Sequence, residues 1–175
     1  MRSPRWSWLT WVGAFLFMMG FASQAHAICG PLTQYTVTNN NDSGAGSLRD
    51  AITQANTAGC PAAINFDASV TSPIVLATEL PSITVDMAIT GLGQGVTVID
   101  GAGNFQGLKT GDDINPFTIS LSNLTIQNGL QSDGRCGAGL ENTFNTTLTL
   151  TNVDVKKHQL SFQAGARFAT SGPSP

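Results

Sequence analysis

Two stretches of nine residues decide the fold of this chain. Residues 118–126 read Thr-Ile-Ser-Leu-Ser-Asn-Leu-Thr-Ile, and 29 positions later residues 147–155 read Thr-Leu-Thr-Leu-Thr-Asn-Val-Asp-Val. The aliphatic positions and the Asn correspond, as do most of the hydroxyl positions, and residues 82–91 form a weaker relative. A repeat with a period of about 20–50 residues indicates a solenoid or a propeller, whose units bury their apolar faces by stacking.

The length of the repeat favours a parallel β-helix over a propeller. A propeller blade needs four strands in about 40 residues, whereas this period holds two or three short ones. Two strands meet at Asn123 in one copy and at Asn152 in the other, and Asn tolerates a left-handed bend. Ile119 and Leu124 then both point inward, and stacked Asn side chains can form a hydrogen-bonded ladder. An antiparallel sandwich is the alternative, although no two-residue hairpin turn separates matching strands.

Short strands separated by turn residues are predicted along most of the chain. They cover residues 35–38, 64–66, 74–76, 83–85, 96–99, 117–121, 124–126, 148–150 and 153–155. One helix of about ten residues is predicted between residue 47 and Gly59. Ser47 and Asp50 have the spacing of a capping box at its N-cap, and Gly59 is a suitable stop. One face of this helix is apolar and contains Leu48, Ala51, Ile52 and Ala55.

The first 27 residues have the layout of a secretory signal peptide. Arg2 and Arg5 precede an apolar run over residues 11–22, and the segment ends in Ala-His-Ala. The run is too short for a bilayer, which takes about 20 residues. Cleavage after Ala27 leaves 148 of the 175 residues, with no transmembrane segment expected. An uncleaved membrane anchor is the alternative.

Charge is scarce and slightly acidic. The chain has 8 Lys and Arg against 11 Asp and Glu, and charged residues make up 11% of it, well below the roughly 25% of ordinary soluble domains. These cations are too few to neutralise a run of phosphates, which excludes a basic nucleic-acid-binding surface. The low charge, together with 41% hydrophobic residues, also argues against a disordered chain.

The cysteines number three, at positions 29, 60 and 136. In an exported protein a Cys29–Cys60 disulfide would tie the new N-terminus to the end of the helix. Cys136 is then left over, either as a buried thiol or as a cysteine whose partner has been lost. His158 is the only histidine after residue 27, so the chain has no zinc-type cluster, and we expect no metal and no cofactor.

The segment around the helix resembles a known family. Residues 42–52 read Asp-Ser-Gly-Ala-Gly-Ser-Leu-Arg-Asp-Ala-Ile. They resemble the N-terminal segment of exported bacterial right-handed parallel β-helix repeat proteins, which often carry a Cys-Ser-Leu-Arg-Glu-Ala motif. Gly46 stands in place of the motif's Cys, and Asp50 in place of its Glu. The resemblance runs from about residue 33 to residue 155 and implies an N-terminal cap followed by stacked, pectate-lyase-like coils.

The cap has a physical purpose in such a stack. The first coil would otherwise expose its apolar core and its strand edges, which invites edge-to-edge association. We therefore expect Leu48 and Ile52 to contact the core, and Arg49 to be a surface or salt-bridge residue. The predicted organisation is a signal peptide at residues 1–27, a cap at 28–62, coils at 63–158 and an irregular or truncated tail at 159–175.

β-Helices also host polysaccharide lyases and hydrolases, so the sequence can be compared with what their chemistry requires. A lyase needs a carboxylate cluster for Ca²⁺ and a Lys or Arg base, and an inverting hydrolase needs facing carboxylates. The available acids are Asp86, Asp100, Asp112, Asp113 and Asp133, and the available bases are Lys109 and Arg135. Asp112 and Asp113 lie in a predicted exposed loop, and residues 100–104 form a predicted turn, so no catalytic residue is assigned.

The sequence thus predicts an all-β, right-handed parallel β-helix with a strand and helix cap. The expected function is that of an exported, non-enzymatic surface or adhesin-like protein, or a fragment of one, located at the cell surface, outside the cell or in the periplasm. Its partner would be a polysaccharide or a neighbouring or host cell. A polysaccharide lyase or hydrolase and an inert truncated fragment are the alternatives.

Overall fold

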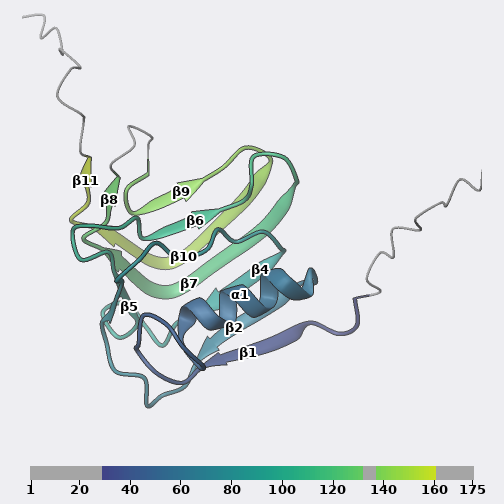
Figure 1. The fold of residues 1–175 in the computed structure, drawn as a ribbon, viewed down its shortest axis with the longest axis horizontal. Coiled ribbons are helices and arrows are strands. Elements are labelled where there is room, and N and C mark those ends of the chain that lie inside the picture. Colours follow the sequence, from purple (N-terminus) through teal and green to yellow (C-terminus); the bar gives the residue numbers. More distant parts are fainter. Residues whose placement is uncertain (1–28, 132–136, 161–175) are drawn as a thin grey trace, which may run out of the picture.

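The computed structural model describes residues 29–131 and 137–160, and these residues form a parallel β-helix. Figure 1 shows the chain winding upward from β1, through about four turns. The fold class predicted from the repeat is therefore confirmed. The predicted signal peptide, residues 161–175 of the predicted tail, and Asp133, Arg135 and Cys136 lie outside the described residues.

The described part contains one helix and eleven short strands. The elements are β1 (Thr33–Val37), α1 (Leu48–Ala58), β2 (Ala62–Phe66), β3 (Ile74–Val75), β4 (Met87–Thr90), β5 (Val98–Asp100), β6 (Leu108–Thr110), β7 (Phe117–Gln127), β8 (Leu130–Gln131), β9 (Leu140–Asn142), β10 (Thr146–Lys156) and β11 (Gln159–Leu160). Every pairing between these strands is parallel.

The strands stack along three sides of the coil. The first side runs from β1 through β2 and β4 to the beginning of β7 and of β10. The second side joins β3 and β5 to the later parts of β7 and β10. On the third side β6 pairs with β9. Ile83, in the coil below, forms a single bridge to Thr110 of β6. A separate short pair, β8 and β11, follows the second side.

The repeat sets the register of the two longest strands. Leu148 lies beside Ile119 and Val153 beside Leu124, so the 29-residue offset seen in the sequence is the pairing in space. Asn123 and Asn152 bend β7 and β10 with φ of 54° and 51°, and the Asn152 side chain donates to the Asn123 Oδ1 at 3.1 Å. The predicted Asn bend and ladder are confirmed.

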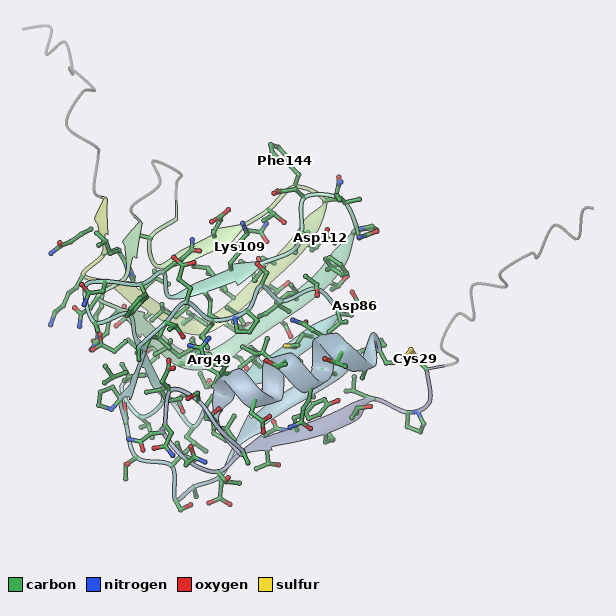
Figure 2. The ribbon with its side chains drawn as sticks, viewed as in Figure 1. Cys29, Arg49, Asp86, Lys109, Asp112 and Phe144 are labelled. Atoms are coloured by element: carbon green, nitrogen blue, oxygen red, sulfur yellow. A yellow bond between two sulfur atoms is a disulfide. The ribbon has the colours of Figure 1, made fainter. Side chains whose placement is uncertain are left out.

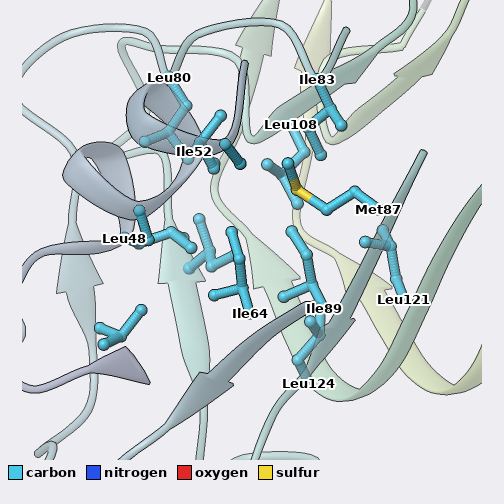
Figure 3. Close-up of a cluster of buried hydrophobic side chains, with 14 of the residues drawn as sticks. Leu48, Ile52, Ile64, Leu80, Ile83, Met87, Ile89, Leu108, Leu121 and Leu124 are labelled. Carbon is cyan, nitrogen blue, oxygen red and sulfur yellow. The ribbon is translucent and has the colours of Figure 1, made fainter. Parts of the chain in front are cut away.

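The interior of the coil is filled by aliphatic side chains (Figure 3). The core positions of β7 are completely buried, and they are Ile119, Leu121, Leu124 and Ile126. Ile64 and Ile89 fill the same interior from the lower coils. Each coil therefore supplies a layer of aliphatic side chains that is covered only when another layer lies above and below it.

The helix is defined by capping at both ends. The Ser47 Oγ accepts the backbone N–H of Asp50 at 3.2 Å, and Gly59 ends the helix in the left-handed conformation. The predicted cap differs in one detail: the Asp50 carboxylate accepts the N–H of Gly46 at 3.0 Å, because the N–H of Ser47 is bonded to the Gly44 carbonyl. The predicted apolar face, Leu48, Ala51, Ile52 and Ala55, is buried.

The helix and the loop before it close the lower end of the stack. Leu48 and Ile52 lie in the core, as predicted (Figure 3). Arg49 forms an ion pair of 2.7 Å with Asp42 and also donates to the carbonyls of Thr78 and Glu79. The predicted salt-bridge role of Arg49 is confirmed, and its bonds to the Thr78 and Glu79 carbonyls join the cap to the next coil.

One predicted strand, at residues 83–85, is reduced to the single bridge between Ile83 and Thr110, and its other edge contacts the helix. The side-chain amide of Asn56 donates to the Ser82 carbonyl at 2.7 Å and accepts the Thr84 N–H at 3.0 Å. These are the two bonds that a neighbouring strand would supply, so Asn56 covers this strand edge. The next strand of the chain, β4, begins at Met87 on the first side, where Met87 pairs with Ile119.

Cys29 and Cys60 are joined by a disulfide, with their Cα atoms 5.5 Å apart. The bond connects the residues before β1 to the end of α1, and Figure 2 shows Cys29 at that side of the stack. The predicted pairing of these two cysteines is thus present. Together with α1, it fastens both ends of the cap segment.

The upper end of the stack differs, because β10 is the last strand of its sheet among the described residues. Leu150 is 46% exposed and Val155 42%, although the residues beside them in β7, Leu121 and Ile126, are fully buried. The described residues therefore leave an apolar layer and a strand edge uncovered at this end.

Candidate functional site

Three of the acids and bases weighed as catalysts, Asp86, Lys109 and Asp112, lie in different parts of the coil (Figure 2). Asp86 precedes β4 and accepts the Thr118 N–H at 2.7 Å. Asp112 and Asp113 lie in the loop between β6 and β7, and Asp100 ends β5 at another corner. In residues 29–131 and 137–160, no three His, Cys, Asp or Glu side chains are grouped closely enough to hold a metal ion.

Asp112 organises its own loop. Its carboxylate accepts the backbone N–H groups of Ile114 and Asn115 at 2.9 Å and 2.8 Å, and the Asn115 side chain at 2.7 Å. The bonds from Asn115 and Ile114 lower the pKa of Asp112 below its ordinary value. The loop is exposed at residues 113–116, as predicted, and the Asp112 carboxylate folds its turn.

Lys109 is paired across the third side of the coil. It forms an ion pair of 3.3 Å with Glu141, whose other oxygen accepts a bond from Gln106 at 2.9 Å. Glu141 was missed among the sequence candidates, because only the pairing of β6 with β9 brings it beside Lys109. The signal available in the sequence was a charge in each of two short strands, and their register could not be read from it.

A polar hollow lies where successive coils turn away from the second side. Its volume is about 350 Å³, and it is lined by Val75, Asp100, Ala102, Gly103, Asn128, Lys157 and Gln159. Asn128 and Lys157 end β7 and β10 with φ of 51° and 59°, so equivalent turns of two coils place these side chains at the same corner. We call this feature the corner hollow.

Asp100 is the most constrained acid in the corner hollow. Its carboxylate accepts the Ala102 N–H at 2.8 Å, the Gln127 side chain at 2.8 Å, and the Asn128 side chain at 2.9 and 3.0 Å. Burial alone would raise the pKa of Asp100, but these bonds and the charge of Lys157 lower it below its ordinary value. The predicted turn at residues 100–104 is present, and its acid is ionised at neutral pH.

The chemistry of the corner hollow is that of hydrogen bonding. It combines a carboxylate, two amides, a cation and open backbone turns, which are the groups that bind hydroxyl-rich ligands. Because the Asp100 oxygens are already engaged by three neighbours, this carboxylate is poorly suited to take a proton from a substrate. The arrangement suits binding rather than proton transfer.

Comparison with protein-family models, with curated proteins and with solved structures finds no match. The described residues define the chain by its fold, as a parallel β-helix protein with an N-terminal helical cap. Over the same residues, α1 is the only helix, and its eleven residues are too few to span a bilayer.

Proposed function

We propose that this chain is an exported, non-enzymatic, adhesin-like β-helix protein, or part of one, that binds polysaccharide or a cell surface. The observation that carries the proposal is the use of the chain's acids. Asp42, Asp86, Asp100 and Asp112 each accept backbone or side-chain hydrogen bonds that hold a turn or join two coils. Acids engaged in this way are poorly suited to proton transfer, which favours binding over catalysis.

Two further features support export and a surface role. The Cys29–Cys60 disulfide is of the kind that persists in oxidising compartments. The scarcity of charge suits neutral, hydroxyl-rich partners, because such ligands are bound by amides, hydroxyls and the occasional charged group rather than by cation clusters. The corner hollow offers that set of groups on one side of the stack.

The test is a glycan array probed with the purified protein, beside a degradation assay on the same polysaccharides with and without Ca²⁺. We expect binding without cleavage. Asp100→Asn and Lys157→Ala should weaken binding if the corner hollow takes part, while the matched change Asp113→Asn, in the exposed loop between β6 and β7, should not. Release of unsaturated or reducing sugar ends would contradict the non-enzymatic proposal and favour a lyase or hydrolase.

A further inference from the structure

We propose that the uncovered end of the stack is a dimer interface, at which two copies of the chain meet tail to tail. Their β10 strands would run antiparallel around a two-fold axis. This inference is independent of the proposed ligand. It rests on the surface of β10, on the symmetry of its sequence and on the cover at the opposite end.

The surface of β10 has the composition of a core layer. Leu148, Leu150, Val153 and Val155 lie beside the fully buried aliphatic residues of β7, yet Leu150 and Val155 are each more than 40% exposed. Across β10, about 36 Å of strand edge presents backbone groups that pair with no other described strand. Such an edge is a template for pairing with another chain.

The spacing of these aliphatic residues is symmetrical. The order Leu148-x-Leu150-x-x-Val153-x-Val155 reads the same in both directions about the peptide between Thr151 and Asn152. A two-fold axis at this peptide puts Leu148 opposite Val155 of the second copy, and Leu150 opposite Val153. All four residues then face the interior on both copies, as an isologous interface requires. The surface is complementary to itself.

The outward-facing residues fit the same register. Thr149 lies opposite Asp154 of the second copy, and Thr147 opposite Lys156. No like charges are placed directly opposite each other, which would destabilise paired strands. Within each copy, Asp154 and Lys156 already form an ion pair of 2.8 Å.

The upper end of a second copy fits β10 better than its lower end does. At the lower end α1 and the Asn56 side chain cover the core layer, so the free edge of β1 offers no open apolar layer. Contact between the two uncovered apolar layers therefore closes the assembly at two copies.

The first test measures the mass of the purified protein in solution by light scattering across a concentration series. We expect a dimer at about 10–100 µM that dissociates on dilution. Leu150→Lys should raise the dissociation constant at least tenfold. Ile114→Lys, at a residue 76% exposed on a loop of a lower coil, should leave it unchanged. A monomer at all concentrations, or equal effects of the two changes, would overturn the proposal.

A second pair of variants tests the register without disturbing the apolar layer. Thr147→Lys places a cation opposite Lys156 of the second copy and should weaken the dimer severalfold. Thr149→Lys places the same cation opposite Asp154 and should maintain or strengthen it. The opposite order, or equal effects, would exclude this two-fold register. A monomer in which the Leu150 side chain is protected from solvent would show that another part of the chain covers β10. That result would also overturn the dimer.

Discussion

The two ends of this β-helix differ in how the apolar layer of the terminal coil is covered. At the lower end, a helix, a disulfide and the side chains of Asp42, Arg49 and Asn56 cover the first coil. At the upper end, the described residues leave β10 with two aliphatic side chains more than 40% exposed. The same spacing of aliphatic residues is core in β7 and surface in β10, because a described strand lies above β7 and none lies above β10.

The largest expected effect separates these two layers directly. Leu121→Ala removes a fully buried side chain and should lower the free energy of unfolding by about 2–5 kcal/mol. Leu150→Ala, at the neighbouring position in β10, should cost about 1 kcal/mol or less, because that side chain is already half exposed. Denaturant unfolding at a dilution that keeps the protein monomeric gives both values. Equal costs would show that β10 is covered in solution.

The next effect concerns the closure of the lower end. The Cys29–Cys60 disulfide closes a loop with a sequence separation of 31 residues, and a loop of that size contributes about 3–4 kcal/mol in the chain-entropy account. The double change Cys29→Ser and Cys60→Ser should destabilise the protein by about this amount. Thermal unfolding of the oxidised protein, the reduced protein and the double variant provides the measurement. An unchanged midpoint would contradict the fastening role.

A smaller effect is expected at the helix side chain that replaces a strand. Asn56→Ala leaves the Ser82 carbonyl and the Thr84 N–H without their partner and should cost about 1–3 kcal/mol. Thr57→Ala is the matched control, because the Thr57 hydroxyl bonds only to Thr53 of the same helix. That control should fall within about 0.5 kcal/mol of the parent protein. A similar loss of stability in both variants would contradict the role of Asn56 in covering this strand edge.

The smallest effect is a pH dependence at the upper end. Burial lowers the pKa of His158 below its ordinary value of 6.5, and its Nδ1 accepts the Gly129 N–H at 3.0 Å. The folded protein therefore binds this proton less readily than the unfolded chain does. The contribution of His158 to stability is complete above about pH 6.5 and is lost as the pH falls toward the lower folded-state pKa.

Hydrogen exchange of β10 and β11 between pH 7.5 and pH 5.5 checks this dependence. We expect faster local opening of these strands at the lower pH, after correction for the intrinsic exchange rate. His158→Asn, whose side-chain oxygen can also accept a hydrogen bond, should flatten the dependence. A pH dependence that persists in this variant would assign it to another group.

The sequence predicts much of this fold because its repeat is local and regular. The offset between residues 118–126 and 147–155 sets the register of β7 and β10, and the Asn at each bend marks the corner. The helix was also predictable from its capping residues, and the Cys29–Cys60 disulfide from the positions of the two cysteines. The patterns of strands and helices depend on residues that are close together in the chain, so the sequence identifies such elements well.

The sequence could not predict contacts that depend on loops of unequal length. The neighbours of Asp100 and Lys109 come from other coils, 27 to 32 residues away, and that spacing varies from coil to coil. The strand expected at residues 83–85 is reduced to a single bridge at Ile83, because Asn56 takes the place of a paired strand on its other edge, and β4 at Met87–Thr90 was not predicted. Candidate sites on a solenoid are set by stacking, which the chain order alone does not reveal.

The most direct test of the central claim is residue-resolved hydrogen exchange at a concentration where the protein is monomeric. The account predicts slow exchange in α1, β2, β4 and β7, and slow exchange in β10 only for the amides directed toward β7. Slow exchange along the whole of β10 in the dilute monomer, or fast exchange in α1 and β2, would contradict a stack that is closed at its first coil and open at its last.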